Sequence, residues 1–246
     1  PVTYTSMANN DIDVFLGNWM PTMEADIAPY RDAGTVDTVR RNLAGAKYTL
    51  AANAAAAGLG ISDFADIADH ADALQNRIYG IEPGNDGNRL ILDMIEADAF
   101  GLGGFQVVES SEQGMLAQVQ RSERRDEPMI FLGWEPHPMN ANFEMTYLAG
   151  GDDWFGPDFG GAEVYTNTRA GFVEECANVG QFLQNLEFTL ELENEIMGAI
   201  LDEGTEPGAA ATAWLSANTG VLAPWLEGVT TRDGGDAMEA VSAALN

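Results

Sequence analysis

"IFLGWEPHPMN", residues 130–140, begins as a buried strand and cannot end as one. It is apolar as far as Gly133, but Pro136 and Pro138 lack the backbone N–H that a strand donates to its neighbour. Trp134 therefore lies where a strand ends, at the rim of a sheet. A tryptophan at that place either packs the rim or forms the wall of a binding site.

Short apolar strands alternate with helical segments along most of the chain. We expect strands at 11–19, 46–53, 77–83, 105–110, 128–134 and 143–148, and helices at 61–76, 84–100 and 111–125. Ser110 and Gln113 suit a capping box for the last of these helices. Beyond residue 171 the chain is mostly helical. This alternation is typical of α/β proteins with helices on both sheet faces, whose ligands bind beyond the carboxyl ends of the strands.

The composition is that of a globular protein with a very acidic surface. The 246 residues are 46% hydrophobic and 20% charged, a length that favours one or two domains with a real core. Lys and Arg number 11 against 39 Asp and Glu, a formal net charge of −28. Such a surface repels phosphate backbones, which excludes nucleic-acid binding through a basic patch. The charge fits either a surface that keeps the chain soluble or a field that attracts small cations.

No apolar run approaches the ~20 residues that span a bilayer, so we expect no transmembrane segment. No signal peptide is recognisable, and the first residues already look like the middle of a domain. Both a trimmed secreted protein and a cytosolic one fit that beginning. Cys176 is the single cysteine, either an inert thiol or, in an exported protein, one without its partner.

A second strand ends in the same way as the first. "VFLGNWMP", residues 14–21, also stops at a glycine, presents a tryptophan, Trp19, and is closed by proline. A third strand offers Tyr48. Aromatic faces attract a cation within about 6 Å, by ~0.5–2 kcal/mol each, and quaternary ammonium groups are bound by cages of such rings. Rim packing and a ligand cage both remain open for Trp19, Tyr48 and Trp134 on these residues alone.

The turn "EPGNDGN", residues 82–88, precedes a helix and is the other candidate site. Free N–H groups at a helix N-terminus suit a carboxylate or phosphate. Simple capping of the helix by Asn85 or Asp86 explains the same residues. The loop lacks the Gly-Lys-Ser/Thr ending of a phosphate-binding Walker motif.

Enzymatic and metal-binding interpretations find little support. The sequence has no Gly-x-Ser-x-Gly elbow, and its two histidines, His70 and His137, have no metal-ligand spacing. His70 is expected on the surface, and His137 could orient the loop beside Trp134. Acidic residues of the stretch 151–161 could bind a hard cation but fit no EF-hand pattern, and a turn with exposed acids is the simpler interpretation. We expect no catalysis, no cofactor and no metal.

Several stretches together resemble one protein family. They are "DVFLGNWMPTMEADIAPY", "NLAGAKYTLA", "YGIEPGNDGNRLI", "VVESSEQGMLAQV", "FLGWEPHPMN" and "ENEIMGAIL". In this order they are similar to the periplasmic choline-binding proteins of bacterial ABC importers, in the quaternary-ammonium branch of the type II solute-binding proteins. The resemblance runs from the first residue almost to the last.

The resemblance implies two α/β lobes, each with a mainly parallel sheet, that close over a ligand held in an aromatic box. Trp19, Tyr48 and Trp134 match box positions, and Asn85 matches a polar residue that meets the choline hydroxyl. The implied lobes are 1–50 with 160–246, and 51–159, with a hinge near 49–53 and 149–165. The implied location is the periplasm.

The chain departs from the family at its beginning. Members of the family start with a further strand–helix–strand stretch that carries another box tryptophan and an aspartate. We expect that stretch to be absent here. In the family it also contains a cysteine that forms a disulfide with the residue matching Cys176, so we expect that partner to be absent too.

The expected function is a receptor, a monomer, that binds choline and delivers it to a membrane permease without catalysis. The nearest rival has the same fold and binds glycine betaine or trimethylamine N-oxide. A choline-ester hydrolase would need a nucleophile and base that the sequence lacks. A truncated scaffold that binds nothing is the third alternative.

Overall fold

The computed structural model describes residues 2–245 and divides the chain into two compact units. Unit 1 contains residues 1–44 and 163–246, and unit 2 contains residues 45–162. The chain passes from one unit to the other twice, inside the long strand β2, Val36–Asn53, and near the start of β7, Gly161–Arg169.

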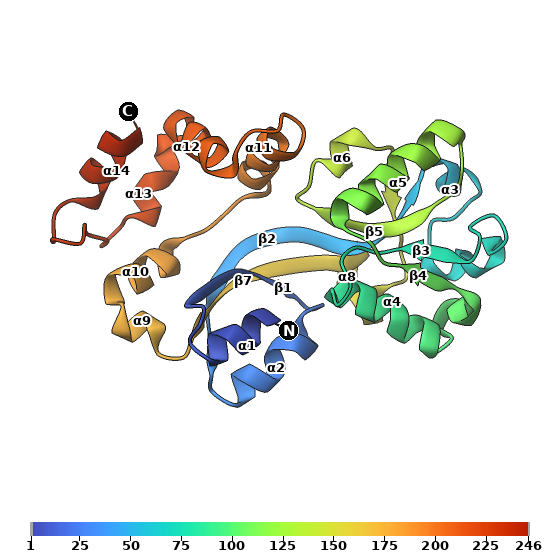
Figure 1. Cartoon of the computed structure of the whole chain (residues 1–246), viewed down its shortest axis with the longest axis horizontal. Helices are drawn as coiled ribbons and strands as arrows, with labels where there is room; N and C mark the ends of the chain where they lie inside the picture. Colours follow the sequence, from blue (N-terminus) through green and yellow to red (C-terminus); the bar gives the residue numbers. More distant parts are fainter. Residues whose placement is uncertain (1, 246) are drawn as a thin grey trace. The chain divides into compact units, whose positions relative to one another are not determined.

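Unit 1 combines a small sheet with helices from both ends of the chain (Figure 1). Strand β1, Val14–Met20, pairs antiparallel with β7, which neighbours the first half of β2. Two helices precede β2: α1, Val2–Ala8, and α2, Glu24–Asp32. After β7 follow α9, Phe172–Glu175; α10, Ala177–Asn185; α11, Leu190–Leu201; α12, Pro207–Ala217; η4, Thr219–Val221; α13, Leu222–Trp225; and α14, Ala237–Leu245.

The core of unit 1 lies between its first two helices and the sheet. Tyr4, Met7, Ile27 and Val36 are at most 2% exposed and form one cluster. The hydroxyl of Tyr4 donates a hydrogen bond of 2.8 Å to the side chain of Asn18 on β1. Burying side chains of this size stabilises the unit by about 1.5–3 kcal/mol each.

Unit 2 is a mixed sheet covered by helices. Its strands are the end of β2; β3, Arg77–Tyr79; β4, Gln106–Val108; β5, Ile130–Glu135; and β6, Met145–Tyr147. Between them lie α3, Ala54–Gly58; η1, Phe64–Asp66; η2, Ala68–His70; α4, Asp86–Glu96; η3, Ala99–Gly104; α5, Glu112–Arg125; α6, Met139–Asn142; α7, Asp152–Phe155; and α8, Pro157–Gly160. In Figure 1 helices α4 and α5 lie on opposite faces of this sheet.

The pairing in unit 2 is only partly parallel. Strand β3 pairs parallel with both β4 and β5, as expected of an α/β sheet. Strand β2 pairs antiparallel with β5 and β6, and β1 with β7 in unit 1, so the sheets are mixed rather than mainly parallel. The antiparallel pairs all involve the two strands that run from one unit into the other.

Two local expectations from the sequence are wrong. Residues 61–76 form no α-helix but two 3₁₀ turns, η1 and η2. The carboxylate of Asp66 folds back onto the N–H groups of Ser62 and Asp63, so the polar side chains close a short turn at this point. The N-cap of α5 is Ser111, whose hydroxyl accepts the N–H of Gly114, and not Ser110.

None of the helices within residues 2–245 is long and apolar enough to span a bilayer.

Candidate aromatic binding site

Tyr48 and Trp134 lie opposite each other on paired strands of unit 2. The antiparallel register of β2 and β5 places Tyr48 across from Trp134 and Leu50 across from Leu132. The two ring centroids are 6.3 Å apart with an interplanar angle of 78°, an edge-to-face contact. Phe155 makes a second such contact with Tyr48, at 6.1 Å and 89°. Three aromatic rings from three elements therefore gather at this end of β5.

Tyr48 is held at both its ring and its hydroxyl. Its side chain is 6% exposed, and the hydroxyl donates a hydrogen bond of 2.7 Å to Oδ1 of Asn85. A Cβ atom at Gly87 would lie 2.2 Å from this hydroxyl, so only glycine allows the close approach. Burial, with a smaller contribution from the charge of Asp86, raises the pKa of Tyr48 well above its usual value, against the hydrogen bond to Asn85. Tyr48 is thus a neutral, fixed ring.

Asn85 is the N-cap of α4. This confirms the prediction that Asn85 or Asp86 caps the helix after the turn. Oδ1 of Asn85 accepts the backbone N–H of Gly87 at 2.8 Å and that of Asn88 at 3.3 Å, besides the hydroxyl of Tyr48. Its Nδ2 donates to Oδ1 of Asp86 at 3.1 Å. Because three donors already share Oδ1, the group left for a ligand is the second N–H of the amide. Asn85 can therefore donate to a hydroxyl or carboxylate oxygen.

Trp134 is half-buried, and the ring of His137 is in contact with its indole. The two ring centroids are 4.9 Å apart. The backbone carbonyl of Trp134 accepts a hydrogen bond of 2.8 Å from the side chain of Asn140. The segment that follows β5 therefore holds both the backbone and the ring of Trp134. Of the two residues involved, the sequence indicated only His137 as a neighbour of Trp134.

Trp19, the fourth candidate, belongs to unit 1. It lies on β1 opposite Val164 of β7 and is half-buried. Its backbone N–H donates to Sδ of Met23 at 3.3 Å, and its carbonyl accepts the N–H of the same residue at 2.9 Å. Unit 2 thus brings together Tyr48, Asn85 and Trp134. That Trp19 belongs to the same binding site stays a prediction.

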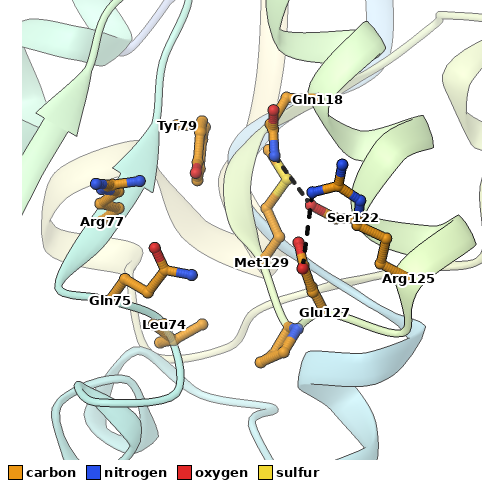
Figure 2. A pocket seen from close by; sticks show the side chains of 10 residues that line it. Leu74, Gln75, Arg77, Tyr79, Gln118, Ser122, Arg125, Glu127 and Met129 are labelled. Atoms are coloured by element: carbon orange, nitrogen blue, oxygen red, sulfur yellow. Dashed lines mark hydrogen bonds and ion pairs between the residues drawn. The ribbon is translucent and has the colours of Figure 1, made fainter.

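A cavity of about 200 Å³ in unit 2 has a different chemical character (Figure 2). It lies where β3 and β5 begin, at Arg77 and Met129, and so at the opposite ends of these parallel strands from Trp134. Arg77 and Arg125 line it, together with amide side chains. The carboxylate of Glu127 also lines it and pairs with Arg125 at 3.9 Å, which leaves the guanidinium of Arg77. With Tyr79 as the one aromatic ring in this lining, the cavity does not suit a quaternary ammonium group, which binds in a cage of several rings.

The described residues provide no metal centre. Within residues 2–245 no three His, Cys, Asp or Glu side chains lie close enough together to hold a metal ion. Cys176, the N-cap residue of α10, is half-buried.

Residues 1–217 match a known family, OpuAC, the substrate-binding domain of an ABC-type glycine betaine transport system. The chain belongs to this family. OpuAC domains bind a substrate for transport and are not enzymes, which excludes the choline-ester hydrolase.

A solved structure of an ABC-transporter choline-binding protein in complex with choline is similar to the whole chain. The identity is 67%, the TM-score is 0.98, and the match covers 85% of that protein. This similarity confirms the α/β fold of the type II binding proteins that the sequence predicted.

Two curated relatives match shorter stretches. The glycine betaine/carnitine transport binding protein GbuC of Listeria monocytogenes is 32% identical over 133 residues, 53% of this chain and 42% of GbuC. An uncharacterized protein, ORF1 of Chromohalobacter salexigens, is 50% identical over 90 residues, 37% of this chain and 58% of ORF1. The matches thus span about half the length of these two relatives.

Proposed function

We propose that this chain is the choline receptor of an ABC importer. The observation that carries the proposal is the edge-to-face pair of Tyr48 and Trp134, at 6.3 Å, beside an amide that retains a free donor. The rings supply cation–π attraction for a trimethylammonium group, and Asn85 supplies a donor for the hydroxyl oxygen. The similarity to a choline-bound protein at 67% identity supports the same ligand.

The remaining parts of the receptor are proposed on the family resemblance. Trp19 of unit 1 contributes a further ring to the box. Strands β2 and β7, through which the chain passes between the units, form the hinge. The receptor works in the periplasm as a monomer and delivers choline to a membrane permease. Closure around choline requires that the ligand binds the closed state more tightly than the open one.

Calorimetric titration with three ligands tests the proposal. Choline is compared with glycine betaine, which replaces the hydroxyl by a carboxylate, and with 3,3-dimethylbutan-1-ol, which has the shape of choline but no charge. We expect choline to bind at micromolar concentration or better, about −8 kcal/mol. The uncharged analogue should bind at least tenfold more weakly, because it gains no cation–π attraction.

The two other outcomes are also informative. Tighter binding of glycine betaine than of choline would identify the chain as a receptor for carboxylated methylamines. Glycine betaine is the substrate that the description of the family names. Equal binding of choline and its uncharged analogue would contradict recognition by cation–π contacts.

A further inference from the structure

We infer that His137 is a positioning residue that fixes the ring of Trp134 for ligand binding. The inference rests on the proposed function, because it concerns the same aromatic site. It begins from the contact between the two rings, whose centroids are 4.9 Å apart at an angle of 65°. Trp134 is half-buried at the end of β5, where its ring meets the edge of Tyr48 and packs beside a core cluster that includes Met139. The ring of His137 restricts the rotamers of the indole further.

His137 is itself held in one orientation. Its side chain is 2% exposed, and both ring nitrogens have partners. The backbone N–H of Met139 donates to Nδ1 at 3.0 Å, so Nδ1 is an acceptor and the proton of the neutral ring is on Nε2. Nε2 faces Oε1 of Glu112 at 3.3 Å and donates to it. A buried ring with both nitrogens engaged has no alternative rotamer of similar energy.

Glu112 is anchored to the turn that precedes α4. It is the first residue of α5, and its carboxylate is 27% exposed. Its backbone N–H donates to Oε1 of Glu82 at 3.0 Å. Contacts therefore run from Glu82 through Glu112 and His137 to the ring of Trp134.

The backbone between the two rings is fixed as well. Nδ2 of Asn140 donates to the carbonyls of Trp134 at 2.8 Å and of His137 at 2.9 Å. The hydroxyl of Tyr147 donates to Oδ1 of Asn140 at 2.8 Å. Because backbone and ring are both ordered before the ligand arrives, binding costs less side-chain entropy than it would with a mobile indole.

The substitution His137→Asn separates positioning from folding. The asparagine Oδ1 can still accept the N–H of Met139, which keeps the turn, but the side chain has no ring for Trp134 and does not reach Glu112. We expect choline affinity to fall at least tenfold while the melting temperature changes by only a few degrees. The matched control is His70→Asn on η2, for which both quantities should stay as in the wild type.

A spectroscopic readout reports on the orientation of the indole directly. The Nε1–H resonance of Trp134, assigned with Trp134→Phe, should shift or broaden in His137→Asn and stay in place in His70→Asn. An unmoved resonance together with wild-type affinity would overturn the inference.

Glu112 provides a second pair of variants if His137→Asn does not fold. Glu112→Gln keeps an acceptor for Nε2 and should leave affinity within about threefold of the wild type, whereas Glu112→Leu should lower it about fivefold and move the indole resonance. Equal affinities and resonances in the two variants would overturn the inference. If the wild-type chain binds neither choline nor glycine betaine, the proposed function fails, but the indole resonance still tests the positioning.

Discussion

The ends of β1 and β5 share a sequence pattern, but their tryptophans have different neighbours. In both, a glycine is followed by a tryptophan and a cis X–Pro bond, Met20–Pro21 in one and Glu135–Pro136 in the other. Trp134 contacts the rings of Tyr48 and His137 within its own unit. For Trp19, Met23 bonds to the backbone, where its Sδ accepts the N–H of Trp19 and its own N–H donates to the carbonyl of Trp19. The same short motif therefore gives one tryptophan whose ring is part of an aromatic cluster and one whose backbone bonds to a residue four positions along the chain.

The largest effect is expected from Trp134→Ala. It removes about 2 kcal/mol of cation–π attraction. It also removes the edge contact that orders the ring of Tyr48 before the ligand arrives, and together these losses weaken choline binding about 100-fold. Calorimetry measures the affinity, and circular dichroism checks that the fold is intact. Unchanged affinity in the folded variant would remove Trp134 from the site.

A smaller loss is expected from Trp19→Ala. This variant loses the cation–π contribution of one ring, about 2 kcal/mol or 30-fold in affinity, without disturbing Tyr48. The same titration measures it. Wild-type affinity in this variant would show that unit 2 alone carries the site, and a loss larger than that of Trp134→Ala would reverse the ranking of the two strand ends.

Tyr48→Phe tests the hydroxyl separately from the ring. The ring stays to face the cation, but Asn85 loses one of the three donors to its Oδ1. Removing such a bond lowers the free energy of unfolding by about 1 kcal/mol. Because it also leaves the amide of Asn85 less ordered before the ligand arrives, choline binding should weaken by at most about fivefold. A loss as large as that of Trp134→Ala would mean that the ligand bonds to the Tyr48 hydroxyl itself.

The smallest effect is expected in the pH dependence of stability. Burial raises the pKa of Tyr48 in the folded chain, whereas an unfolded tyrosine loses its proton near pH 10. Above about pH 10 the unfolded state therefore binds fewer protons than the folded state, and the free energy of unfolding falls as pH rises. Urea unfolding at pH 9, 10 and 11 should show a shallower fall for Tyr48→Phe than for the wild type. Equal slopes would contradict a buried neutral Tyr48.

The position of Trp134 could be predicted from the sequence because glycine and proline determine locally where a strand ends. Its pairing with Tyr48 could not, because the register of β2 and β5 joins residues 86 positions apart. The contact of His137 with Glu112, across 25 residues, depends in the same way on the packing of α5. The spacing of Ile61, Phe64 and Ile67 does carry a signal, because buried residues at every third position fit a 3₁₀ turn as well as an α-helix.

The amide of Asn85 shows a further limit of sequence reasoning. The turn indicated both a cap and a ligand contact, and the structure confirms the cap. The orientation of the amide depends on Tyr48, whose hydroxyl reaches Oδ1 of Asn85 because Gly87 has no side chain. One N–H of the amide is occupied by Asp86, which leaves the other for a ligand.

The most direct test of the central claim is a nuclear Overhauser measurement between choline and the aromatic rings. The nine methyl protons of choline give one sharp signal, and only the Trp and Tyr rings of an otherwise deuterated chain are protonated. We predict transfer from the methyl protons to the rings of Trp134 and Tyr48, and its loss in Trp134→Ala. Transfer confined to Tyr79, which lines the cavity with the two arginines, or transfer that persists in Trp134→Ala would contradict the account.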